Sequence, residues 1–176
     1  MRELMIKIIF TLFISFLIIN CDSKIENPIK EGDLIFHEST SSQSEELMLS
    51  TRSKYTHMGI IHIINGKFYV YEAVQPVGFT PLDKWISRGK NKHHVIKRLR
   101  NADELLTHDN IKKMKEIGKH YFGRDYDNLF QWNDNKIYCS ELVWKIYKNA
   151  LNVEIGKLQK FKDFDLTNPK VKALIQ

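Results

Sequence analysis

The chain has 176 residues, a hydrophobic fraction of 43% and a formal net charge of +6. Its length predicts one domain, and its hydrophobic fraction is enough for a real core. Residues 84–100 are the densest basic stretch, but Trp85 is the only aromatic residue near these charges, which argues against nucleic-acid binding and predicts a solvated face or one attracted to anionic envelope surfaces.

Residues 1–20 have the pattern of a signal peptide. A positively charged start precedes an apolar run at 8–19, and Asn20 and Cys21 follow it. The run holds about 12 residues, whereas a membrane span needs roughly 20. An anchor helix or a buried N-terminal helix is therefore the less favoured interpretation.

Residues 18–21, Ile-Ile-Asn-Cys, resemble a bacterial lipobox, in which the cysteine is lipidated and becomes the first residue of the mature protein. Asn20 is larger than the residue usual at its position. Residues 21–30 are polar and predict a short tether, so residues 31–176 are expected to form a single folded domain. The resemblance implies a lipoprotein anchored through Cys21.

The two cysteines, Cys21 and Cys139, allow three interpretations. They could form a disulfide, because an exported protein folds in an oxidising compartment. Cys139 could also be an inert buried thiol. Lipidation would use Cys21 and leave Cys139 as a lone thiol, which in an exported protein suggests a chemical role. We therefore favour a nucleophile.

Strand-like and helix-like segments follow from residue 31 onward. Apolar, β-branched or alternating runs predict strands at 32–36, 58–64, 67–74 and 94–99. Amphipathic patterns and end signals predict helices at 45–51, 80–89, 109–122 and 140–151. Thr80 is expected to cap the second helix, with Pro81 at its first position. These elements predict an α+β fold, a small antiparallel sheet with helices on one side.

Asn65 and Gly66 predict a two-residue hairpin turn between the second and third strands. With that turn, His57 would pair with residue 74, and Glu72 would lie diagonally across from His57 on the same face. Diagonal neighbours are roughly 7–8 Å apart, close enough for a carboxylate to reach an imidazole. Such a hydrogen bond would fix the ring tautomer and leave the other nitrogen free for a thiol.

Cys139 lies at the first turn of the last predicted helix. The positive end of the helix macrodipole favours a thiolate there. A histidine nearby would be the base, and a carboxylate would orient that histidine. Cys139, His57 and Glu72 together are the parts of a cysteine hydrolase.

Other interpretations of these residues remain open. His37 and His62 compete with His57 as the base, and His57 alone could be an ordinary surface histidine. Glu72 is more unusual, because a carboxylate seldom lies among core residues without a partner. A metal site is weakly supported, since the sequence has no helical histidine pair at spacing four and no paired cysteines.

Four short motifs in a fixed order resemble the permuted papain-like amidases of the YiiX/YaeF group, relatives of the NlpC-type cell-wall cysteine peptidases. They are Gly-Asp-Leu-Ile-Phe at 32–36, Tyr-Thr-His-Met-Gly-Ile at 55–60, Tyr-Glu-Ala at 71–73 and Tyr-Cys-Ser-Glu-Leu-Val at 138–143. In this group the histidine and its partner precede the cysteine, a circular permutation of the papain order. The resemblance implies a circularly permuted papain-like (NlpC-like) fold.

By this resemblance Cys139 is the nucleophile, His57 the base and Glu72 the group that orients the base. A backbone N–H of Cys139 or its neighbour would form the oxyanion hole. The remaining candidates for substrate or oxyanion contacts are Tyr126, Asp33, Ser140 and Tyr138.

The sequence therefore predicts an exported cysteine hydrolase of the bacterial cell envelope, which cleaves an amide in a peptide or amino-acid conjugate, such as a cell-wall peptide, through a thioester on Cys139. Its expected partners are a small peptide, amino-acid amide or acyl substrate and, through Cys21, a membrane. No cofactor, metal or nucleic acid is expected. One alternative is a thiol acyltransferase or lipid-modifying enzyme on the same fold. Another is a non-catalytic envelope ligand-binding module, in which Cys139 would be unreactive.

Overall fold

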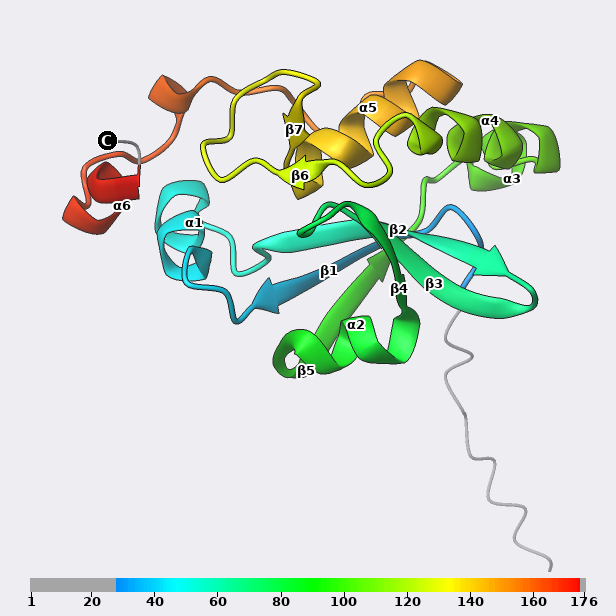
Figure 1. Cartoon of the computed structure of the whole chain (residues 1–176), viewed down its shortest axis with the longest axis horizontal. Coiled ribbons are helices and arrows are strands. Elements are labelled where there is room, and N and C mark those ends of the chain that lie inside the picture. Colours follow the sequence, from blue (N-terminus) through cyan, green and yellow to red (C-terminus); the bar gives the residue numbers. More distant parts are fainter. Residues whose placement is uncertain (1–27, 175–176) are drawn as a thin grey trace, which may run out of the picture.

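The computed structural model describes residues 28–174, so the predicted signal peptide, Cys21 and most of the tether lie outside the described residues. Five antiparallel strands form a sheet in the order β4-β3-β2-β1-β5 (Figure 1). Their bounds are β1 Leu34–Ser39, β2 His57–Ile64, β3 Lys67–Glu72, β4 Gly78–Pro81 and β5 Gly89–Lys97. A short parallel pair, β6 Asp125–Tyr126 and β7 Lys136–Ile137, precedes the last long helix.

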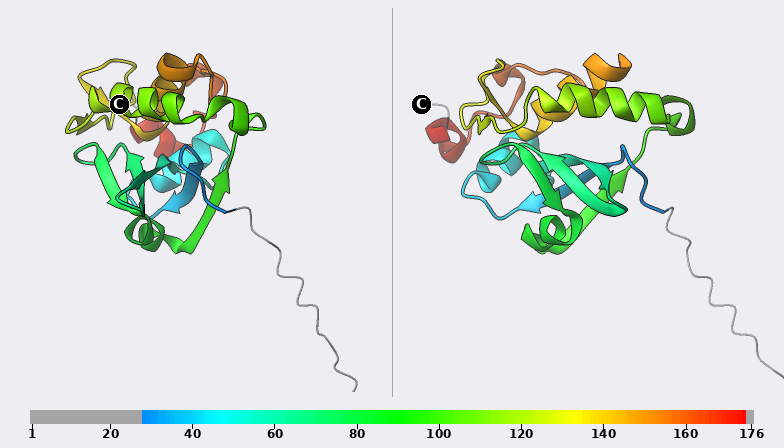
Figure 2. Two further views of the ribbon diagram at one scale, coloured as in Figure 1. Left: turned by 90° about the vertical axis from the view of Figure 1, so that its right-hand side faces the viewer. Right: turned by 45° about the vertical axis from the view of Figure 1, so that its right-hand side comes forward.

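The helices are α1 Ser44–Thr51, α2 Leu82–Arg88, α3 Ala102–Leu105, α4 His108–Lys119, α5 Cys139–Leu151 and α6 Pro169–Leu174, with a 3-10 turn at Phe161–Asp163. Both views in Figure 2 show α4 and α5 together over one face of the sheet. Within residues 28–174 none of these helices has the length and apolar character needed to cross a membrane.

The sheet is covered on both faces, so the prediction of helices on one side was wrong for α2. In the larger core, side chains of α4 and α5 pack against sheet residues such as Ile60 and Tyr71. A second cluster of fully buried side chains lies on the α2 side and consists of Ile35, Ile61, Val70 and Trp85. Trp85 gives this short helix a large apolar surface to bury, which is why α2 packs against the opposite face.

The predicted hairpin between β2 and β3 is confirmed. Asn65 and Gly66 form its turn with φ of 50° and 73°, the left-handed conformation that a two-residue turn of this kind requires. The strands pair Ile64 with Lys67 and Ile60 with Tyr71. Continuing this register would bring residue 57 opposite residue 74, as the sequence predicted.

The segment around Thr80 differs from the prediction. Thr80 lies in β4, opposite Val70, and α2 begins after Pro81 with no side-chain cap. The Thr80 hydroxyl donates instead to the buried carboxylate of Glu72, at 2.5 Å. A hydroxyl that satisfies a buried charge stabilises the fold more than a cap at the exposed start of a short helix.

The helix that carries the cysteine begins at Cys139, one residue earlier than expected. Tyr138 is the N-cap residue and its side chain does not cap the helix. The carboxylate of Glu141, in the first turn of the helix, is buried. Lys145 donates to the same carboxylate at 2.7 Å and ties it to Asp134 in the preceding loop. Lys145 therefore ties the first turn of α5 to the loop before it.

Candidate active site

Cys139 and His57 are brought together where the start of α5 lies over the start of β2. The thiol is buried and hydrogen-bonded to the His57 imidazole. The backbone N–H groups of Met58 and Ser140 also donate to the sulfur. These neighbours stabilise the anionic form of the sulfur.

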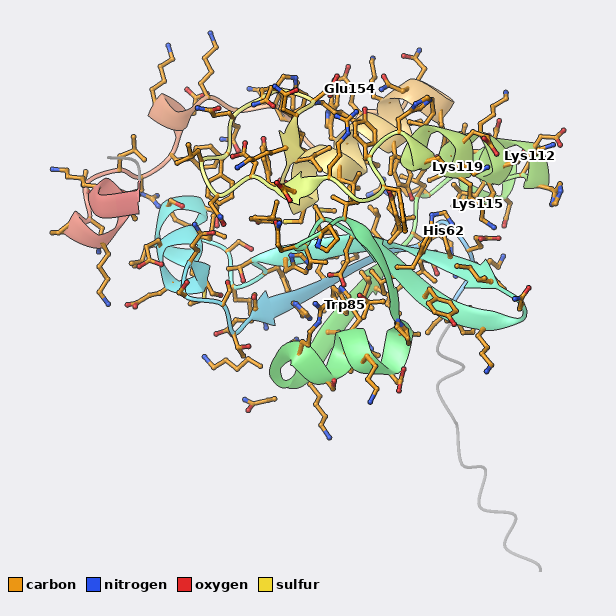
Figure 3. The ribbon with its side chains drawn as sticks, viewed as in Figure 1. His62, Trp85, Lys112, Lys115, Lys119 and Glu154 are labelled. Atoms are coloured by element: carbon orange, nitrogen blue, oxygen red, sulfur yellow. The ribbon has the colours of Figure 1, made fainter. Side chains whose placement is uncertain are left out.

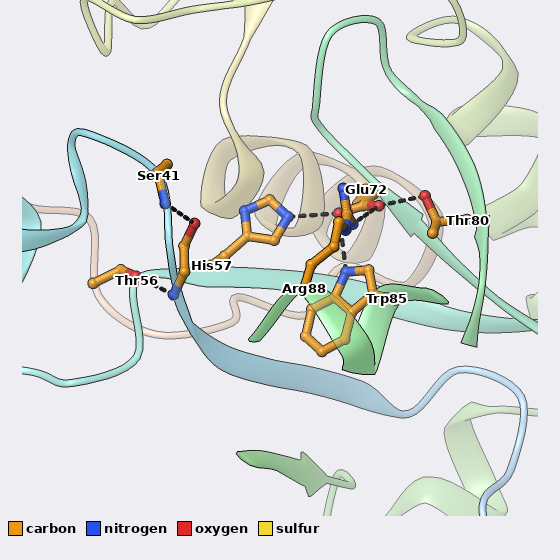
Figure 4. Close-up of polar contacts among 8 residues, drawn as sticks. Ser41, Thr56, His57, Glu72, Thr80, Trp85 and Arg88 are labelled. Carbon is orange, nitrogen blue, oxygen red and sulfur yellow. Dashed lines mark hydrogen bonds and ion pairs between the residues drawn. The ribbon is translucent and has the colours of Figure 1, made fainter. Parts of the chain in front are cut away.

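His57 is oriented by Glu72, as the hairpin spacing predicted. The distance from His57 Nε2 to Glu72 Oε2 is 2.6 Å (Figure 4). Because Nε2 bonds the carboxylate, Nδ1 is the ring nitrogen left for the thiol. Cys139, His57 and Glu72 thus form a continuous hydrogen-bonded row across α5, β2 and β3.

Glu72 is fully buried, and further donors meet its carboxylate. Trp85 Nε1 donates to Oε2 at 2.9 Å, Thr80 Oγ1 donates to Oε1, and the Arg88 guanidinium also donates to Oε1 (Figure 4). Burial alone would raise the pKa of Glu72, but its bonds with His57, Thr80 and Arg88 outweigh burial and lower it. The carboxylate is therefore ionised at neutral pH.

The thiol and the imidazole shift each other's pKa in opposite directions. Burial opposes the charge on His57, but its bonds to Cys139 and Glu72 are stronger and raise the pKa of His57 to about 9. Burial also opposes the thiolate, but the bond from His57 and the two backbone donors lower the pKa of Cys139. Both shifts favour a thiolate beside an imidazolium over the neutral pair.

Tyr126, Tyr138 and Ser140 also lie at this site. The side chain of Tyr126, from β6, is hydrogen-bonded to Cys139, and burial raises its pKa, so the phenol stays protonated. Tyr138 precedes the thiol as the N-cap residue, and its ring contacts Phe130. Ser140 contributes its backbone N–H while its side chain is exposed.

Asp33 is not brought into the site. It is fully buried at the start of the sheet, where Arg98 Nε donates to its Oδ1 at 2.6 Å and Arg98 Nη2 to its Oδ2 at 2.8 Å. The backbone N–H of Lys30 also donates to it. These bonds satisfy the carboxylate within the fold, so the expectation of a pocket residue at Asp33 is not supported.

The two competing histidines have other neighbours. His62 lies on the α4 side of the sheet, where Glu31 is 3.3 Å from its Nδ1, whereas Trp85 lies on the α2 side (Figure 3). His37 stacks on Trp85 at a ring-centroid distance of 3.9 Å. Burial, with repulsion from His57, lowers the pKa of His37 to about 4. The geometry therefore favours His57 as the base.

Sequence reasoning missed three of the Glu72 donors: Thr80, Trp85 and Arg88. They follow Glu72 by 8, 13 and 16 positions, across a turn, a strand and a helix. No residue pattern links such positions. The one available signal was a tryptophan in a short helix, which indicated a buried contact.

No group of three or more His, Cys, Asp or Glu side chains in residues 28–174 could hold a metal ion.

The sequence and the fold of this chain are similar to those of known proteins. Residues 28–176 match the family model described as "Permuted papain-like amidase enzyme, YaeF/YiiX, C92 family". The chain is 43% identical over 145 residues to the uncharacterized protein YiiX of Escherichia coli strain K12, covering 82% of this chain and 70% of that protein. A crystal structure of YiiX from Escherichia coli O157:H7, described as a metalloprotein, matches with a TM-score of 0.77 and 44% identity, covering 82% of this chain and 78% of the other.

Proposed function

This chain belongs to the YaeF/YiiX family of permuted papain-like amidases, and from that membership we propose that Cys139 is the nucleophile of an amide-cleaving reaction. The family makes the protein a cysteine amidase or peptidase-like hydrolase with the circularly permuted papain-like fold. The observation that carries the assignment of residues is the hydrogen-bonded row Cys139–His57–Glu72. The thiolate–imidazolium pair is the reactive form that such a hydrolase needs.

The proposed reaction has two halves, formation of a thioester and its hydrolysis. The Cys139 thiolate attacks the amide carbon, and the carbonyl oxygen becomes an oxyanion. His57, as the imidazolium, gives its proton to the leaving nitrogen, and the C–N bond breaks to release an amine. Water then attacks the thioester while His57 takes its proton, and the carboxylic acid leaves with Cys139 again free.

Two donors are suited to the oxyanion. The backbone N–H of Cys139 is at the first position of α5, where helical N–H groups have no intrahelical acceptor. The Tyr126 phenol is protonated and already touches the sulfur, so it can turn to an oxygen bonded to the adjacent carbon. Glu72 keeps the imidazole in the required tautomer through both halves of the reaction.

The proposed substrate is an amide in an envelope peptide or amino-acid conjugate. The test is incubation with a panel of aminoacyl, peptide and acyl amides, followed by intact-protein mass spectrometry. We expect release of an amine and a transient mass increase equal to the acyl group, located on Cys139. Amine release without any adduct on Cys139, in the presence of an acyl-trapping quench, would contradict the thioester route.

A thiol acyltransferase is the second candidate, and one observation favours it. Leu129 and Trp132, in the loop between β6 and β7, are 63% and 49% exposed. This loop joins Tyr126 to the strand before Cys139, so an apolar acyl group could rest on it. Long-chain acyl donors with an added amine or alcohol acceptor distinguish the two activities, because a transferase forms the new ester or amide faster than it releases free acid.

We also propose that the protein is exported and anchored by lipid on Cys21, on the basis of the sequence pattern of residues 1–21. Expression in a bacterial host with a labelled fatty acid should label the wild type. The Cys21→Ser variant should lose the label and leave the membrane fraction. Equal labelling of both proteins would contradict the anchor.

A further inference from the structure

The carboxylate that orients His57 is bonded to a second cation. Arg88, the last residue of α2, donates to Glu72 Oε1, while His57 Nε2 meets Oε2. The Glu72 carboxylate is fully buried, and the Arg88 side chain is 43% exposed. Arg88 thus reaches from the surface to the far side of the group that orients the base.

Arg88 is held in place by its helix. The adjacent Trp85 is fully buried and donates to the same carboxylate, so α2 cannot shift without disturbing both bonds. The backbone carbonyl of Arg88 accepts a hydrogen bond from Thr40 at 3.4 Å. The ion pair between Arg88 and Glu72 is therefore part of the packed α2 face and not a loose surface contact.

The titratable groups around His57 come from four other elements. Cys139 of α5 and Glu72 of β3 bond its ring, and His37 of β1 lies at a ring-centroid distance of 5.4 Å. Tyr126 of β6 contacts the Cys139 sulfur, which in turn contacts His57. His37 and the Tyr126 phenol are neutral at neutral pH. Among residues 28–174, His57 and Arg88 are the cationic partners of Glu72.

A carboxylate with no other cation would place its full negative charge beside His57. That charge would stabilise the imidazolium and make it a weaker acid. The reaction proposed above requires His57 to release its proton to the leaving nitrogen, so an imidazolium that is too stable slows this step. A guanidinium on the opposite oxygen reduces the charge felt at the ring and keeps the carboxylate ionised and in place.

We propose that Arg88 is a positioning residue that sets the pH range of the Cys139–His57 pair by neutralising part of the charge on Glu72. This inference rests on the function proposed above and deepens it. It assigns to α2, a helix on the face of the sheet away from Cys139, control over the base. Arg88 acts through Glu72 and does not contact the thiol.

The test uses the thiol itself and needs no substrate. Iodoacetate carries a negative charge, so its rate of reaction with Cys139 should fall when the imidazolium loses its proton, near pH 9 in the wild type. In Arg88→Met the pH at which this rate falls should increase by about one unit, because removal of a nearby positive charge favours protonated His57. Mass spectrometry after short treatments across the pH range gives the rates.

Three further variants separate charge from packing. Arg88→Gln keeps a donor for Glu72 but removes the charge and should behave like Arg88→Met, whereas Arg88→Lys should stay near the wild type. Arg98→Met is the matched control, since Arg98 pairs with the equally buried Asp33 away from the site. Arg98→Met should lower thermal stability and leave unchanged the pH at which the iodoacetate reaction rate falls.

The outcomes distinguish the two proposals. If folded Arg88→Met and Arg88→Gln both keep the wild-type pH dependence, the role of Arg88 is overturned and the proposed function stands. If Arg98→Met shifts the fall as much as Arg88→Met, the effect is general and the role of Arg88 is again overturned. If the rate of iodoacetate reaction with wild-type Cys139 does not fall near pH 9, the thiol is not paired with an imidazolium, and both the role of Arg88 and the proposed function fail.

Discussion

Replacing Cys139 by serine should reduce amide cleavage by about 10³-fold or more while the protein stays folded. A serine hydroxyl has a far higher pKa than a thiol, so the donors that hold the sulfur as a thiolate cannot hold an alkoxide at neutral pH. The smaller side chain fits the same buried position at the first turn of α5. Initial rates on the best amide of the panel, with a thermal melt of each protein, measure both properties.

Ser140→Ala is the matched control for this substitution. Ser140 is the next residue of the same turn, and it contributes a backbone N–H while its side chain is exposed. Its rate should remain within a few-fold of the wild type. A Cys139→Ser protein that retained the wild-type rate would show that the nucleophile lies elsewhere.

Glu72→Gln should lose most of the activity and also lower the free energy of unfolding, by about 2–4 kcal/mol. The wild-type carboxylate accepts bonds from His57, Trp85, Thr80 and Arg88. A glutamine amide offers one acceptor oxygen and an NH₂ group that must face two of these donors. Unpaired donors in a fully buried site account for the stability loss, and a misoriented imidazole accounts for the loss of rate.

Asp33→Asn separates these two effects. Asp33 is also fully buried and also paired with an arginine, but its bonds lie within the fold and not at the thiol. This variant should lose stability and keep its rate per folded molecule. Denaturant unfolding and initial rates for both variants give the comparison. Normal turnover by folded Glu72→Gln, with an inactive His62→Ala or His37→Ala, would mean that the base is assigned to the wrong histidine.

The part of the site that could be predicted from sequence is the part built by local geometry. A two-residue turn at Asn65 and Gly66 sets the register of one hairpin, and that register alone brings His57 near Glu72. The position of Cys139 at a helix start follows from the periodicity of α5. The resemblance to the family then predicted that Cys139 of the helix lies beside His57 of the hairpin, which the periodicity of either segment could not show.

The surroundings of Glu72 could not be predicted in the same way. Trp85 and Arg88 reach the carboxylate because α2 crosses the face of the sheet opposite α5, and that placement depends on tertiary packing. Thr80 carried a valid helix-capping signal, but its hydroxyl satisfies a buried charge instead. Asp33 looked like a site residue by its motif, and only the contact with Arg98 showed its place in the fold.

The order of the site along the chain has a consequence for when its chemistry begins. Cys139 follows His57 by 82 positions, and the thiol acquires its donors only when α5 docks on β2. An unfolded or half-synthesised chain carries an ordinary, mostly protonated thiol. The thiol is thus unactivated until the chain has folded, so labelling of Cys139 near neutral pH reports how much of a preparation is native.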